Sequence, residues 1–182
     1  MHVALPISAS RSAIQPGFVM LEAMSSGRVF AERSTALTRQ EKDAGVLEVA
    51  TQQILLSEAI ENAGFDVEAT ETAEDREKAV TRLDVALIRI RDNHLGLRFG
   101  SEELDLPADH SQAFNDQFDA QIEPHFITMS RIGDELVASA SSGERLRPGA
   151  ASDLARESEE FREGMNGLAT LIKDEAQARV GS

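Results

Sequence analysis

Apolar residues recur at alternating steps of three and four along most of this chain. This is the spacing of amphipathic helices that pack in a bundle. The first stretch predicts a helix from about Thr35 to Ala63, with Gly64 as its C-cap. The second predicts a helix from about Ala73 to His94, which Gly96 and Gly100 then break. Both helices are long enough to span a domain.

Two further helices follow the same spacing. The third begins with Asp109 as its N-cap. Pro124 lies inside its apolar stripe, and we expect a kink there rather than an end, because the periodicity resumes at once. The fourth runs from about Ala151 to Arg179, where Gly164 and Gly167 leave room for a neighbouring helix to approach closely.

Four such helices, with no clean period-two alternation and no internal repeat, predict an all-α fold. We expect an antiparallel up-down four-helix bundle over residues 34–182. Residues 1–33 are predicted to be an irregular N-terminal arm, since Pro6 and Pro16 interrupt it. The short apolar piece Phe18–Leu21 is expected to be either a helical turn or part of a poorly ordered arm.

Composition narrows the function classes. The 18 Lys and Arg against 32 Asp and Glu give a net charge of −14, which argues against non-specific binding to nucleic acid or anionic lipid. The absence of Cys excludes disulfides and thiolate chemistry. No apolar stretch approaches the roughly 18 to 20 residues that span a bilayer. We expect a soluble chain, either cytoplasmic or part of a longer membrane receptor.

Residues that carry chemistry are few. Gln53 and Ser57 lie one turn apart on the predicted core face. They either line a ligand pocket or dimer interface, or bond to each other or to nearby backbone and fix the helix register. His94 is expected to end its helix, where a cation interacts well with the dipole. No catalytic set, metal-ligand spacing or phosphate loop is present, so we expect no enzyme activity, metal or cofactor.

The segment Asp43–Ile60 resembles the first-helix motif of the PilJ-type sensor domain. That domain is named for the N-terminal region of the type IV pilus chemotaxis transducer, and it is related to the sensing domains of nitrate/nitrite histidine kinases. The family motif runs approximately A-G-R-Q-R-M-L-S-Q-R-I. The matching residues in this chain are Ala50, Gln53, Leu56, Ser57 and Ile60.

Two more segments are similar to the family. Ile122-Glu123-Pro124-His125-Phe126 fits its pattern of a large apolar residue, any residue, Pro and then an aromatic. The segment from Met165 to Ala176 looks like its final helix, so the resemblance covers about residues 40–180. It implies a receptor sensing domain that works as a dimer, with the first helix contributing.

The chain departs from this family at the motif's arginines, which fall on Gln52, Ile54 and Ala59. In the nitrate sensors, the arginine that aligns with Ile54 comes from each of two subunits and holds the anion between them. Ile54 has no donor, so we expect no nitrate or nitrite site. We expect a neutral or mostly apolar ligand to contact Gln53, Ile54, Ser57 or Phe126.

The sequence thus favours a ligand-sensing domain of a bacterial signalling receptor, such as a chemoreceptor, sensor kinase or cyclase. It would transmit by helix shifts and bind a small molecule of unknown identity. We expect the isolated domain to be a weak, parallel homodimer with the first helix contributing, or a monomer–dimer equilibrium. The periplasmic portion of an inner-membrane receptor is the favoured location, with the cytoplasm as the alternative. The alternative function is a free-standing helical interaction module or a secreted binding protein.

Overall fold

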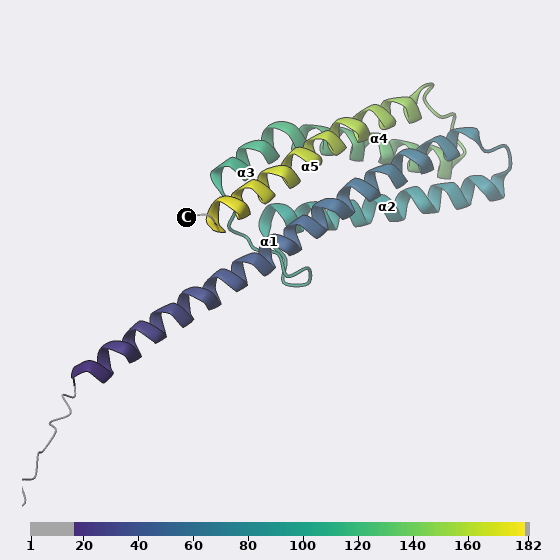
Figure 1. Ribbon diagram of the computed structural model, residues 1–182. Helices are drawn as coiled ribbons and strands as arrows, with labels where there is room; N and C mark the ends of the chain where they lie inside the picture. The colour runs from purple at the N-terminus through teal and green to yellow at the C-terminus, as the bar shows by residue number, and fades with distance from the viewer. Residues whose placement is uncertain (1–16, 181–182) are drawn as a thin grey trace, which may run out of the picture. The chain divides into compact units, whose positions relative to one another are not determined.

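The computed structural model describes the backbone of residues 17–180 and the side chains of residues 38–180. The chain divides into two compact units, residues 1–39 and 40–182. The helical bundle lies in the second unit and is built from three long helices and one bent helical rod (Figure 1). Within the described residues the structure contains no strand, and only Ser101 and Leu106 form an isolated β-bridge. The predicted all-α bundle is confirmed.

The first helix, α1, spans Gly17–Ala69 and is longer than the sequence pattern suggested. The predicted irregular arm is therefore wrong for residues 17–33, while residues 1–16 lie outside the described part. Pro16 directly precedes the helix, and Gly17 to Ser34 contains no further proline. A single glycine such as Gly27 costs only about 1 kcal/mol in a helix, which a long helix tolerates.

Two glycines that were expected to end helices lie inside them. Gly64 lies within α1, and a Cβ there would come 2.6 Å from Cδ2 of Leu154, so only glycine fits without displacing that side chain. Gly96 lies within α2 (Ala73–Phe99), where the following loop packs Leu104 and Leu106 against it. The predicted C-cap at Gly64 and break at Gly96 are wrong, because these glycines permit close packing. The predicted break at Gly100 is confirmed, since Gly100 is the C-cap of α2.

The third rod consists of α3 (Gln112–Gln117), a π-helical turn η1 (Phe118–Ile122) and α4 (Glu123–Ser142). Ser111, not Asp109, is the N-cap, and its Oγ accepts a hydrogen bond from the Phe114 N–H at 3.1 Å. The wider π turn comes just before Pro124, which lacks an N–H and clashes with a regular helical carbonyl. The rod bends at the proline and continues, as predicted.

The last helix, α5 (Ala150–Val180), packs directly against the π turn. A Cβ on Gly164 would lie 2.5 Å from the carbonyl oxygen of Gln121, and one on Gly167 would lie 2.5 Å from Nε2 of Gln117. The predicted close approach at these two glycines is confirmed. No side chain larger than hydrogen fits at Gly164 without moving the backbone of the neighbouring rod.

Contacts across the helix interfaces occur in reverse residue order along the two partners. The pairs are Gln53 with Ile90 and Asp66 with Arg82 between α1 and α2, and Glu68 with Ala151 and Asp43 with Arg179 between α1 and α5. The core between the helices is closed by buried aliphatic and aromatic side chains, among them Leu83, Leu87, Phe118 and Phe161. No helix within residues 17–180 is long and apolar enough to cross a membrane.

Candidate ligand-binding site

Two of the four residues that were predicted to contact a ligand are buried inside the bundle. Gln53 and Ser57 on α1 are fully buried. The Gln53 Nε2 group donates to the carbonyl oxygen of Ile90 on α2 at 3.1 Å, and Ser57 Oγ donates to the carbonyl oxygen of Ile54 at 2.8 Å. Both side chains bond to backbone and not to each other. The Gln53 bond joins α1 to α2 and fixes the position of one helix relative to the other, whereas the Ser57 bond stays within α1.

Gln53 is only half satisfied. Its Oε1 atom is buried without a hydrogen-bond partner among the described residues. A buried amide oxygen left unpaired costs about 1 to 3 kcal/mol of stability. The hydrogen bond to Ile90 therefore sets the position of α1 relative to α2, and its net contribution to the free energy of unfolding is small.

Ile54 lies on a different face of α1. It is half-buried and lines a shallow surface pocket of about 470 Å³ between α1 and α5. The pocket also has one arginine and four glutamates: Arg162, Glu58, Glu61, Glu159 and Glu163. The Arg162 guanidinium bonds to Glu61 at 2.7 Å and to Glu159, so its charge is already neutralised. This pocket is acidic and is poorly suited to hold an anion.

The fourth predicted residue, Phe126, lies elsewhere again, on α4. Its ring stacks on the imidazole of His94 with centroids 3.5 Å apart and planes 6° from parallel. His94 is 3% exposed, and its Nε2 lies 2.8 Å from Oε2 of Glu123. Burial lowers the pKa of His94 even though the Glu123 carboxylate acts to raise it. The expectation that His94 simply ends a helix is wrong, because α2 continues to Phe99 and this imidazole is packed in the core.

An aromatic row passes through His94. Successive ring centroids lie 3.5 to 6.2 Å apart along it. In order, its members are His110, Phe114, Phe118, His94, Phe126 and Phe161. The row connects α2, α5 and the bent rod of α3, η1 and α4. A displacement of the Phe126 ring would therefore shift side chains on all three.

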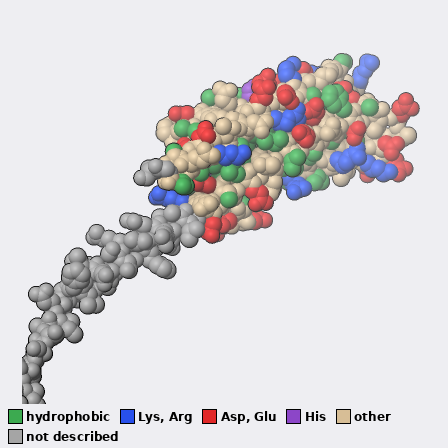
Figure 2. Space-filling view, viewed as in Figure 1, with side chains coloured by type: hydrophobic (Ala, Val, Ile, Leu, Met, Phe, Trp, Pro, Cys, Tyr) green, Lys and Arg blue, Asp and Glu red, His purple; other side chains and the backbone are tan. Residues whose placement is uncertain are grey.

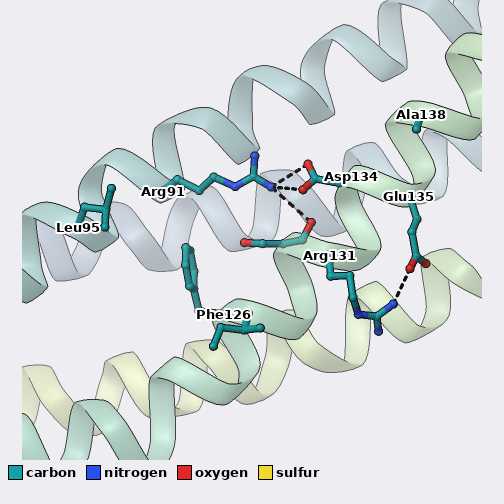
Figure 3. Close-up of a pocket in the computed structure, with 9 residues that line it drawn as sticks. Arg91, Leu95, Phe126, Arg131, Asp134, Glu135 and Ala138 are labelled. Carbon is teal, nitrogen blue, oxygen red and sulfur yellow. Dashed lines mark hydrogen bonds and ion pairs between the residues drawn. The ribbon is translucent and has the colours of Figure 1, made fainter.

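A surface groove opens at Phe126. It lies between α2 and α4, has a volume of about 730 Å³ and is lined mainly by apolar atoms. Figure 3 shows Arg91 projecting from α2 toward Asp134 on α4, and Leu95 and Phe126 also line the groove. Leu95 is 53% exposed and Ile127 is 56% exposed. We call this surface the α2–α4 groove.

The charged side chains of the α2–α4 groove are already paired. Nη2 of Arg91 lies 2.7 Å from both carboxylate oxygens of Asp134, and Nη1 of Arg131 lies 2.5 Å from Oε1 of Glu135 (Figure 3). A ligand in the groove would contact mainly apolar atoms, and the charged side chains around it are already neutralised by ion pairs. Such a site suits a neutral, apolar or weakly polar molecule.

The four predicted residues thus occupy three separate places, and only Phe126 reaches the groove. Leu95, Arg91 and Asp134 were not predicted from the sequence, because α2 and α4 supply them from positions about forty residues apart. One available signal was the exposed side of α2, where Leu95 directly follows the buried His94 but is itself exposed. Within the described residues, no group of three or more His, Asp or Glu side chains is placed to hold a metal ion.

Comparisons of this chain with protein-family models, with curated proteins and with solved structures found no match.

Proposed function

We propose that residues 40–182 form a ligand-sensing domain whose ligand binds in the α2–α4 groove. One observation carries the proposal: Phe126 belongs both to the groove and to the aromatic row in the core. A ligand on the outer side of Phe126 contacts the ring that holds His94 of α2 against α4. Its binding energy can therefore favour one arrangement of these two helices over another.

The parent protein under this proposal is a bacterial chemoreceptor, sensor kinase or cyclase, with this domain in the periplasm. Small shifts along the first and last helices would carry the signal. The PilJ-type resemblance of the first helix supports this assignment, although the anion site of the nitrate sensors has no counterpart at Ile54. The ligand class follows from the groove, which favours a neutral, mostly apolar small molecule.

A titration of the full chain with neutral aliphatic and aromatic alcohols tests the proposal. We expect a saturable rise in melting temperature, with amide shifts in NMR spectra centred on α2 and α4. Ile127→Asn should abolish the rise, because this exposed side chain lines the groove. Leu55→Asn is the matched control, since Leu55 on α1 is 59% exposed and lies outside the groove. Equal loss in both variants, or no saturable effect, would contradict the proposal.

The alternative of a helical protein-interaction module has its own support. The outward face of α2 carries exposed apolar side chains, which are typical of protein interfaces. A chain that ignores small molecules but binds a protein through α2 would favour this function over sensing.

A further inference from the structure

A second surface pocket lies between α1, α2 and the loop that follows α2. Its volume is about 720 Å³, and its lining comes from Gln52 on α1, from the part of α2 between Arg89 and Gly100, and from the loop. The Asn93 Nδ2 group donates to Oε1 of Gln52 at 3.4 Å, which joins the two helices within this lining. We call it the α2-loop pocket. Leu95 lines both this pocket and the α2–α4 groove, so the two sites adjoin.

The loop wall of the α2-loop pocket is held in place by backbone hydrogen bonds. The Ser101 N–H donates to the Leu106 carbonyl oxygen at 3.1 Å, and the Leu106 N–H donates to the Ser101 carbonyl oxygen at 2.8 Å. Gly100 permits the turn out of α2, because its φ is +82° and a Cβ there would lie 2.8 Å from the nitrogen of Ala108. Glu103 lies within this closed loop and lines the pocket. The pocket is therefore formed before a ligand binds, which reduces the entropic cost of binding.

Three charged side chains of the α2-loop pocket have no partner within the chain. The side chains of Arg89, Asp92 and Glu103 make no ion pair or hydrogen bond within residues 38–180, and all three are exposed. Other arginines of α2 are paired: Arg82 with Asp66, Arg91 with Asp134, and Arg98 with Asp119. Basic and acidic side chains also lie next to one another on the face of the bundle that Figure 2 shows. Arg89 and Asp92 lie one turn apart on α2, so their opposite charges can reach the same small molecule.

We propose that the α2-loop pocket binds a free amino acid with an apolar side chain. The Arg89 guanidinium binds the ligand's carboxylate through paired donors. The Asp92 carboxylate accepts a hydrogen bond from the ligand's ammonium group, and Glu103 adds a second negative charge from the loop. Leu95 and Phe99, both more than half exposed and four residues apart, offer an apolar surface to the ligand's side chain. This inference does not rest on the ligand proposed above for the α2–α4 groove.

The charges of the pocket favour a zwitterion over an ion of one sign. A simple anion would approach Asp92 and Glu103, and a simple cation would approach Arg89, so each would face repulsion from part of the lining. A neutral molecule would displace water from all three charged groups without replacing its hydrogen bonds. An amino acid presents one charged group to each sign and an apolar group to the apolar surface.

Isothermal titration calorimetry of the full chain with leucine at low ionic strength tests the inference. Isocaproate, which lacks the ammonium group, and isoamylamine, which lacks the carboxylate, are the matched analogues. Leucine should bind at least about tenfold more tightly than either, because each analogue leaves one charge of the pocket unpaired. Equal or tighter binding of either analogue would overturn the inference, and so would the absence of saturable leucine binding up to about 10 mM.

Charge-removing substitutions locate the site. Arg89→Gln and Asp92→Asn should each weaken leucine binding at least about tenfold. Arg145→Gln and Asp84→Asn are the matched controls, since both side chains are exposed and lie outside the pocket, and they should change it less than about twofold. Ile127→Asn should leave leucine binding unchanged, because Ile127 lines only the α2–α4 groove. This variant separates a failure of this inference from a failure of the proposed function. Circular dichroism checks that each variant stays helical. Equal losses in a pocket variant and its control, or a loss in Ile127→Asn alone, would overturn the inference.

Discussion

Side chains usually distribute with apolar groups buried and polar groups exposed. The α1–α2 interface and the outward face of α2 both depart from this, in opposite ways. Inside, Gln53 and Ser57 are polar, fully buried and bonded to backbone. Outside, Leu95 and Phe99 are apolar and more than half exposed. The hydrogen bonds that these buried groups make go to backbone within the bundle, whereas no described residue covers the exposed apolar groups. Sites for partners are therefore expected on the outer surface of α2 and not along the polar positions of the core.

Neighbouring isoleucines on α2 give the largest test of this contrast. Ile90 is fully buried and Ile88 is 49% exposed. Ile90→Ala should lower the free energy of unfolding by about 2 to 5 kcal/mol, because it leaves a cavity in the core. Ile88→Ala should cost less than about 1 kcal/mol in the monomer.

Urea denaturation at low protein concentration measures both values. The two substitutions remove the same atoms from the same helix, so propensity cancels between them. Similar losses in the two variants would show that the outer face of α2 is covered.

The sequence predicted the long helices well, because their apolar periodicity is a local property. It failed where a distant residue decides the local structure. Gly64 is typical of a helix end, but Leu154 packs against it from α5 and the helix continues. His94 was recognised on the apolar face, yet its partners Glu123 and Phe126 come from α4. The groove could not be predicted, since it exists only where α2 and α4 meet.

Acid should destabilise the bundle through His94, which is the second-largest effect. Burial lowers the pKa of His94 below its ordinary value of 6.5, so the unfolded chain takes up the proton first. The contribution of His94 to stability is complete above pH 6.5 and is lost as the pH falls from there toward the lowered pKa. Burial lowers the pKa of His110 too, and its effect has the same sign.

Urea midpoints between pH 8 and pH 5.5 measure this dependence. The loss is at most about 1.4 kcal/mol per pH unit for each histidine. His94→Gln should reduce the slope, and His110→Gln should reduce it separately. A midpoint that stays constant over this range, or rises on acidification, would contradict the buried position of His94.

A smaller effect is expected when Gln53 becomes apolar. Gln53→Met keeps the approximate volume, loses one hydrogen bond to Ile90 and removes the unpaired Oε1 atom. Because the buried unpaired oxygen costs about as much as the bond contributes or more, the variant should gain roughly 0.5 to 1 kcal/mol. Gln52→Met, on a half-buried neighbour, should change stability by less than about 0.5 kcal/mol. A loss of more than about 1.5 kcal/mol in Gln53→Met would mean that this amide stabilises the bundle.

The smallest expected effect is the response to nitrate, which should be none. An occupied anion site at a hundredfold excess over its dissociation constant would add about 2.7 kcal/mol of stability. Ile54 offers no donor, and the nearby Arg162 is held by Glu61 and Glu159 in a pocket with two further carboxylates. A nitrate ion there would have to displace Arg162 from both partners and approach like charges. Melting temperatures in sodium nitrate and in sodium chloride at equal ionic strength should therefore coincide, and the same holds for nitrite. A saturable rise specific to nitrate would place an anion site elsewhere on the bundle, and Arg162→Gln would then show whether this pocket contributes to it.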